Sequence, residues 1–225
     1  MVTHVVMKDE PLIIAIDGPS GSGKSSTSRG VARRLGLAYL DTGAMYRAAA
    51  WLVAERTLED PAAIIDAVAT TPMDIALDPA AFAITVDGTD VTEAIREPRI
   101  SASVSKVSTI QAVRDILIAR QRALIAGADG GIVVEGRDIT TVVAPEAQVR
   151  VLLVADPAAR IARRQAELGD RADHAQVTDQ VIRRDADDST VAAFTEAAAG
   201  VTVVDSTHLT LDQVIDRICG MAPPS

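Results

Sequence analysis

The feature that most constrains this chain is the run G-P-S-G-S-G-K-S at residues 18–25. It matches the pattern G-x-x-x-x-G-K-[S/T], in which glycines let the backbone approach a polyphosphate and successive N–H groups point at its oxygens. The apolar run Leu12–Ile16 before it predicts a buried parallel strand, and Lys24–Leu35 after it predicts a helix that Gly36 ends. A strand, a glycine-rich turn and a helix N-terminus together favour an α/β fold with a nucleoside-triphosphate site.

Each part of this loop has an expected role. Lys24 is expected to reach the β- and γ-phosphates of ATP and to act in catalysis, and Ser25 is expected to hold Mg²⁺. Glu135, which follows a predicted apolar strand, is the second candidate ligand for Mg²⁺. For Glu135, and for Asp17 just before the loop, a carboxylate that only caps a turn is an equally good interpretation. The residues expected to bind ATP are Gly18, Pro19, Ser20, Gly21, Ser22, Gly23, Lys24, Ser25 and Ser26.

The rest of the chain alternates short apolar strands with helices. Further strands are expected at Ala38–Leu40, Ile132–Val134, Val149–Val154 and Val201–Val204, and helices at Gly43–Glu55, 61–68, Ile110–Ile125, Pro157–Glu167, Val177–Asp187 and Leu211–Cys219. This alternation predicts a parallel sheet flanked by helices. Between Pro72 and Pro98, the texture changes to short strand-like pieces at Met73–Leu77, Phe82–Val86 and Thr89–Val91. Together with the turn pair Asp87-Gly88, they predict a small antiparallel insert.

Composition narrows the class of partner. The chain is 48% hydrophobic and 24% charged, as expected for a globular protein, and its net charge of −9 disfavours binding to nucleic acid or an anionic membrane. The single cysteine, Cys219, excludes an intrachain disulfide. The first residues do not read as a signal peptide and no apolar run is long enough to span a bilayer, so we expect a cytoplasmic protein. The low aromatic content, 2%, weakly favours a monomer.

Residues outside the loop separate classes of nucleotide-binding protein. The sequence contains no asparagine, so both the N-K-x-D element of guanine-nucleotide switches and the H-R-D…N loop of protein kinases are absent. A small-molecule kinase needs a second anion site that faces the γ-phosphate. Arg47 and Arg137 follow predicted strands, where the carboxyl ends of parallel strands converge on one crevice. Two classes stay open at this point: a kinase of a small acceptor, whose identity these residues do not fix, and a regulatory nucleotide-binding protein that phosphorylates no acceptor.

Five motifs in order resemble bacterial cytidylate kinases. They are I-D-G-P-S-G-S-G-K-S (16–25), Y-L-D-T-G-A-M-Y-R (Tyr39–Arg47), V-R-D-I-L-I-A-R-Q-R (Val113–Arg122), E-G-R-D (Glu135–Asp138) and R-D-A-D-D-S (Arg184–Ser189). The resemblance implies transfer of the γ-phosphate of ATP to CMP or dCMP with Mg²⁺. It also implies a P-loop core at 11–71, 102–157 and 188–220, a nucleoside-monophosphate-binding (NMP-binding) insert at 72–101 and a helical lid at 158–187.

The resemblance also implies roles for individual residues. Ser105, Arg114 and Asp138 would read the cytosine edge, Arg47 and Arg137 would hold the acceptor phosphate, Arg184 and Asp188 would contact the sugar, and Thr42 would join this acceptor site. Arg137, Arg160 and Arg164 would act in catalysis together with Lys24.

The sequence departs from the family pattern at three places. Val191 stands where the family usually has an arginine, and Thr195-Glu196 replaces a Pro-Leu pair. Thr140 replaces the glycine of the family's G-R-D-x-G-T run. The loss of an arginine at 191 puts contacts between the lid and the acceptor in question, but it leaves the P-loop and Arg137 unchanged.

Overall fold

A computed structural model of the protein describes residues 10–168 and 197–223. Its core is a five-stranded parallel sheet in the order β2-β6-β1-β7-β8. The strands are β1 (Ile13–Asp17), β2 (Ala38–Asp41), β6 (Ile132–Gly136), β7 (Val149–Val154) and β8 (Thr202–Asp205). The predicted strands are confirmed, with ends that differ by one or two residues. Because β1 lies in the middle, the loop that follows it begins at the centre of the sheet's carboxyl edge.

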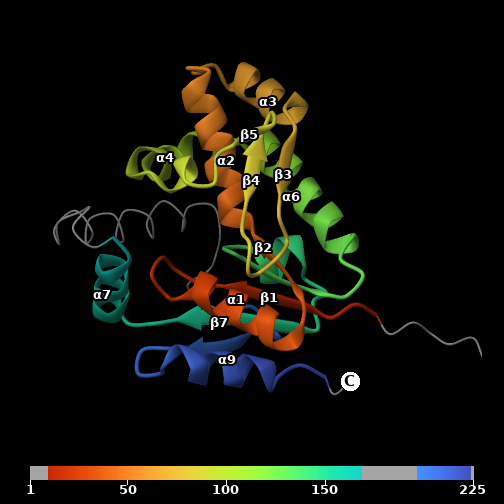
Figure 1. Cartoon of the computed structure of the whole chain (residues 1–225), viewed down its shortest axis with the longest axis vertical. Coiled ribbons are helices and arrows are strands. Elements are labelled where there is room, and N and C mark those ends of the chain that lie inside the picture. Colours follow the sequence, from red (N-terminus) through yellow and green to blue (C-terminus); the bar gives the residue numbers. More distant parts are fainter. Residues whose placement is uncertain (1–9, 169–196, 224–225) are drawn as a thin grey trace, which may run out of the picture.

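Helices cover both faces of this sheet (Figure 1). The helices of the described residues are α1 (Lys24–Leu35), α2 (Thr42–Glu55), α3 (Pro61–Thr70), α4 (Pro98–Ser103), α5 (Ser105–Ser108), α6 (Gln111–Ala126), α7 (Pro157–Leu168) and α9 (Leu211–Cys219), with the short helical turns η1 (Ala94–Arg96) and η2 (Ile139–Val143). Helices α3 and α4 pack on α2 and not on the sheet. Helix α1 begins and ends where the sequence predicts, and Gly36 ends it in the left-handed conformation. The short helices α4 and α5 were not predicted. The predicted helix at 177–187 lies outside the described residues.

The side chains of β1 alternate between two hydrophobic clusters, as a buried strand requires. Ile14 and Ile16 pack with α1 and α9 on one face. Ala15 packs with α6 and β2 on the other face. Helices α1 and α9 pack against each other. In Figure 1, α9 lies below β7, and α2 and α6 extend above β1. Burial on both faces explains why this strand reads as a continuous apolar run.

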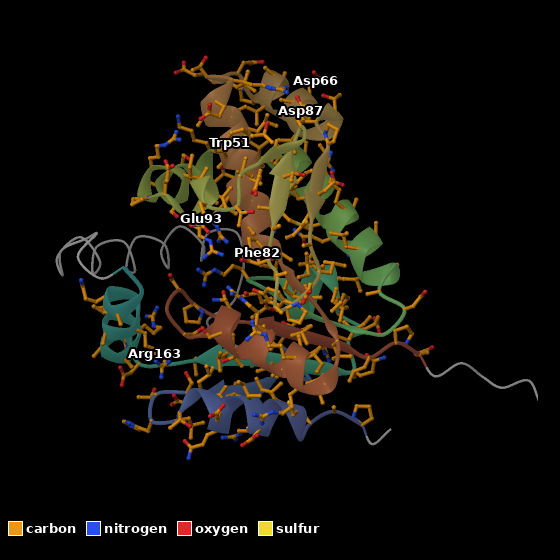
Figure 2. All side chains as sticks on the ribbon, viewed as in Figure 1. Trp51, Asp66, Phe82, Asp87, Glu93 and Arg163 are labelled. Atoms are coloured by element: carbon orange, nitrogen blue, oxygen red, sulfur yellow. The ribbon has the colours of Figure 1, made fainter. Side chains whose placement is uncertain are left out.

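The predicted antiparallel insert is present as a three-stranded sheet in the order β3-β4-β5. Its strands, β3 (Met73–Ile75), β4 (Ile84–Val86) and β5 (Thr89–Asp90), are shorter than the sequence predicted. Asp87 and Gly88 form its hairpin turn, both with positive φ angles. Phe82, labelled in Figure 2, packs against two hydrophobic clusters, one that includes residues of β1, α1 and α9 and the other including Ile84 and Val86 of the insert. The guanidinium of Arg96 lies over its ring. The insert is therefore docked on the core by an aromatic anchor.

Candidate active site

The P-loop, residues 18–26, takes a conformation that only glycine permits at two of its positions. Gly18 and Gly21 have φ angles of +152° and +74°. A Cβ at Gly18 would lie 2.1 Å from the carbonyl oxygen of Leu153, and one at Gly21 would lie 2.7 Å from that of Arg160. The glycines therefore serve close backbone packing against β7 and α7 as well as the turn itself.

Four cationic side chains from three parts of the chain donate to carbonyl oxygens of this loop. Arg137, after β6, donates to Gly18 O at 2.5 Å, and Lys24 of α1 donates to Pro19 O at 2.8 Å. Arg160 and Arg163 of α7 donate to Ser20 O at 3.1 Å and to Ser22 O at 3.4 Å. A peptide unit points its N–H away from its carbonyl. These contacts therefore hold the loop by its carbonyl groups, which leaves the opposite N–H groups out of these bonds, and they concentrate positive charge at the loop in a chain of net charge −9.

Arg163 is a member of this set that the sequence analysis did not single out as a site residue. Its guanidinium also donates to Ser206 Oγ at 2.9 Å and to Ser206 O at 2.6 Å, in the loop between β8 and α9. Figure 2 shows the residue beside α7. Ser206 is buried and donates to Val154 O. The helix carries three arginines, and Arg163 and Arg164 follow Arg160 at spacings of three and four residues, which place them on a common side of the helix. The sequence pattern alone therefore does not separate Arg163 from the other two.

Glu135 lies at the end of β6, next to the P-loop strand, and its side chain is buried. Burial raises the pKa of its carboxyl, and Asp41, which faces it across the β2–β6 ladder, adds to that rise. Lys24, Tyr39 and Ser25 oppose the rise, the last two by hydrogen bonds to the carboxylate. The structure therefore brings the two predicted Mg²⁺ ligands, Ser25 and Glu135, into contact.

Two ion pairs lie on the predicted acceptor side. Arg114 of α6 donates to Asp138 at 2.6 Å, and both side chains are nearly buried. Arg47 of α2 donates to Asp41 at 2.9 Å, and Asp41 also caps that helix through the N–H of Ala44. The sequence analysis assigned Arg47, Arg114 and Asp138 to the acceptor site but did not assign Asp41. Its position before a helix could have suggested the cap.

Other residues assigned to the acceptor site have different surroundings. The buried hydroxyl of Thr42 donates to Glu135 O at 2.7 Å. Ser105 begins α5 and is half-buried. Tyr46, which the sequence analysis did not select, buries a hydroxyl that has no hydrogen-bond partner within the described part of the chain. Burial, together with the nearby Asp138, raises the pKa of Tyr46 to about 12.

Asp17, whose role the sequence left open, accepts three hydrogen bonds from the turn η2. The structure therefore shows it holding a turn. The side chain of Arg164 is not among those described, and Arg184, Asp188, Val191 and Thr195-Glu196 lie outside the described residues.

The family is decided by comparison with known proteins. The family model described as cytidylate kinase matches residues 14–223. The chain belongs to the cytidylate kinase family. Cytidylate kinase from Cutibacterium acnes is 60% identical over 220 residues, which cover 96% of this chain and 98% of that protein. Cytidylate kinase from Streptomyces avermitilis is 49% identical over 211 residues, which cover 92% and 90%. Membership of this family confirms the resemblance that the five motifs predict.

A solved structure supports the fold alone. An uncharacterized protein from Eubacterium ventriosum superposes with a TM-score of 0.53 at 12% identity, over 93% of this chain and 96% of that one. The α/β class predicted for this cytidylate kinase family member is confirmed by its own parallel sheet. Across residues 10–168 and 197–223, none of the helices combines the length and the apolar character that crossing a membrane requires.

Proposed function

We propose that this protein transfers the γ-phosphate of ATP to CMP or dCMP, giving ADP and CDP or dCDP. The proposal agrees with the family and with the names of the relatives above. The observation that carries it is the placement of Arg137. Its guanidinium bonds to Gly18 of the P-loop, while the next residue, Asp138, pairs with Arg114. The loop proposed to bind ATP and an ion pair suited to recognising a polar base are therefore linked by one short turn.

The proposed mechanism relies on positioning and charge neutralisation, without a covalent intermediate. The N–H groups of the P-loop and the N-terminus of α1 would bind the donor phosphates. Lys24 and Arg137 would neutralise charge that develops during transfer, and Arg47 would hold the acceptor phosphate. Arg160 donates a hydrogen bond to Ser20 O of the loop, and we assign it with Lys24 and Arg137 to the residues that neutralise charge. Arg164 is assigned with it from the sequence alone.

On the acceptor side, Arg114 offers donors and Asp138 offers acceptors. These are the two kinds of group that the amino, ring-nitrogen and carbonyl positions of cytosine require. Ser105, at the start of α5, would add a hydroxyl, and Thr42 would support the site through Glu135. Arg184 and Asp188 remain the residues proposed for the sugar. The NMP-binding insert at 72–101 and the lid at 158–187 are proposed as the parts that close on the nucleotides.

The residues present fit Mg²⁺, which we propose as the cofactor. This ion keeps several waters and needs few protein ligands beside the phosphates. A buried carboxylate in contact with a P-loop hydroxyl, as Glu135 is with Ser25, suits it. Bound there, the ion would supply further neutralisation of the donor phosphates. A monomeric, cytoplasmic protein without nucleic-acid or membrane partners stays our prediction from the sequence.

The test is a coupled assay of ADP release with ATP alone and with CMP, UMP or AMP added. We expect CMP to stimulate release strongly and the Lys24→Ala variant to stay at background. A second candidate, a regulatory protein that binds nucleotides without turnover, predicts nucleotide binding with no CMP-dependent release. Release that is stimulated by another small acceptor and not by CMP would instead identify a different small-acceptor kinase.

A further inference from the structure

One carboxylate outside the turn that carries Arg137 and Asp138 holds the start of η2. Asp17 accepts from the backbone N–H of Ile139 at 2.9 Å and from that of Thr140 at 2.8 Å. The hydroxyl of Thr140 adds a third hydrogen bond at 2.7 Å. All three donors lie within η2, which begins directly after Asp138. The conformation of the turn therefore depends on a residue 122 positions earlier in the chain.

The carboxylate of Asp17 is deeply buried, which raises the free-energy cost of losing one of its hydrogen bonds. Asp17 is 3% exposed, and burial raises the pKa of its carboxyl although the three hydrogen bonds oppose that rise. A buried acceptor that loses a donor carries its full desolvation cost. Ile139 and Thr140 are also buried, so water cannot easily replace the lost partner.

Asp17 is the rigid member of this arrangement, and η2 is the member that depends on it. Asp17 pairs with Gly136 on one side and with Leu152 on the other, within the central strand of the sheet. Beyond Gly136 the chain leaves the sheet. Arg122 donates to Val142 O at 2.6 Å and to Val143 O at 3.3 Å, at the far end of the turn, and Arg150 donates to Thr140 O at 3.5 Å. Loss of a hydrogen bond to Asp17 should therefore loosen the start of the turn, next to Asp138, while the P-loop stays anchored by β1.

Thr140 occupies the position at which the family pattern has glycine, so its hydroxyl is an addition in this chain. Thr140 is 4% exposed, and its Oγ1 donates to the same carboxylate oxygen of Asp17 as its own N–H does. A β-branched residue also restricts the backbone more than glycine does. Thr140 thus contributes both a hydrogen bond and stiffness to the turn.

We propose that Asp17 is a positioning residue of the acceptor site, and that it acts with Thr140 to hold the turn at 137–143 so that Arg137 and Asp138 meet the acceptor nucleotide. The inference rests on the proposed function for its kinetic consequences. Its structural part, the hydrogen-bonded turn, requires no nucleotide.

The first test compares steady-state kinetics of Thr140→Val with Thr140→Ser and Thr141→Val. Valine keeps the shape of Thr140 but removes the hydroxyl, whereas serine keeps the hydroxyl. Thr141 is the matched control because it lies in the same turn and is exposed. We expect Thr140→Val to raise the KM for CMP on the order of tenfold, the effect of one lost hydrogen bond to a charged group. The KM for ATP should stay unchanged, and both other variants should resemble the wild type.

The second test measures amide hydrogen exchange of the free protein. Thr140→Val and Asp17→Asn should speed exchange at Ile139 and Thr140, while amides 20–24 of the P-loop keep their wild-type rates. If Asp17→Asn does not fold, the valine variant alone decides. Unchanged exchange, or an equal rise in the KM values for CMP and ATP, would overturn the inference while leaving the proposed function intact. A wild-type protein that never phosphorylates CMP would overturn the proposed function. The exchange rates would still test whether Asp17 and Thr140 hold the turn.

Discussion

Breaking the Arg114–Asp138 pair should lower both the Tm of the protein and its kcat/KM for CMP, and the two effects can be measured separately. In Asp138→Ala, Arg114 keeps its charge in a site where its side chain is only 12% exposed. Removal of one partner from a buried ion pair costs about 3–5 kcal/mol, and we expect about 3 kcal/mol here because some water reaches both groups. For a chain of this length, that corresponds to a fall in Tm of roughly 6–12 °C. Arg99→Ala, in an exposed ion pair, is the control and should leave Tm unchanged.

Recognition is measured by kcat/KM for CMP and by KM for ATP. A site built on hydrogen bonds discriminates steeply, so Asp138→Ala should lower kcat/KM for CMP by about 10²-fold or more. The KM for ATP should stay within about threefold, since the P-loop is a separate site. The double variant Arg114→Leu with Asp138→Val should recover most of the lost Tm, because an apolar pair of similar volume removes the unpaired charge. It should recover no activity with CMP. Equal losses for CMP and ATP, or restored CMP turnover in the double variant, would refute the reasoning.

Three further predictions concern the P-loop and its surroundings. Lys24→Ala should keep the fold, as judged by circular dichroism, and lower kcat by about 10²-fold or more; a loss of only a few fold would show that Lys24 is not catalytic. Gly21→Ala should weaken ATP binding and lower Tm, because its Cβ would lie 2.7 Å from Arg160 O at a φ of +74°, and unchanged ATP affinity would contradict this packing. Burial raises the pKa of both tyrosines, that of Tyr46 to about 12. The neutral form is then favoured in the fold, so the associated stability is present below pH 10 and is lost as pH rises toward 12. Ultraviolet titration of the folded protein should therefore show no tyrosinate at pH 10, and ionisation with the ordinary pKa would be the contrary result.

Much of the fold follows from local sequence patterns. Strands buried on both faces appear as bare apolar runs, and α1 is bounded by a glycine-rich turn and by Gly36, so their positions could be predicted. Helices α4 and α5 are too short to show a period, and their ends are set by packing against α2. The antiparallel strands are shorter than predicted because pairing with a neighbour, which sequence alone does not fix, decides where each strand ends.

The candidate site also contains residues that local sequence motifs predict and residues that they do not. The P-loop and Arg137 carry local motifs, so the sequence indicated them directly. The hydrogen bonds of Asp17 connect residues that are far apart in the chain, and nothing near Asp17 in the sequence distinguishes a turn-holding carboxylate from a catalytic one. Arg163 looks like its neighbours in α7, and only the position of Ser206 separates it from them.

The most direct test of the account is a competition among acceptors. The protein is incubated with ATP labelled in its γ-phosphate and with equal concentrations of CMP, UMP, GMP and AMP, and the products are separated by chromatography. The Arg114–Asp138 pair, with Ser105 as a proposed third member of the site, predicts that the label appears mainly in CDP, and that Lys24→Ala forms this product at least about 10²-fold more slowly. Label that accumulates in GDP or ADP, or only in free phosphate, would contradict the account.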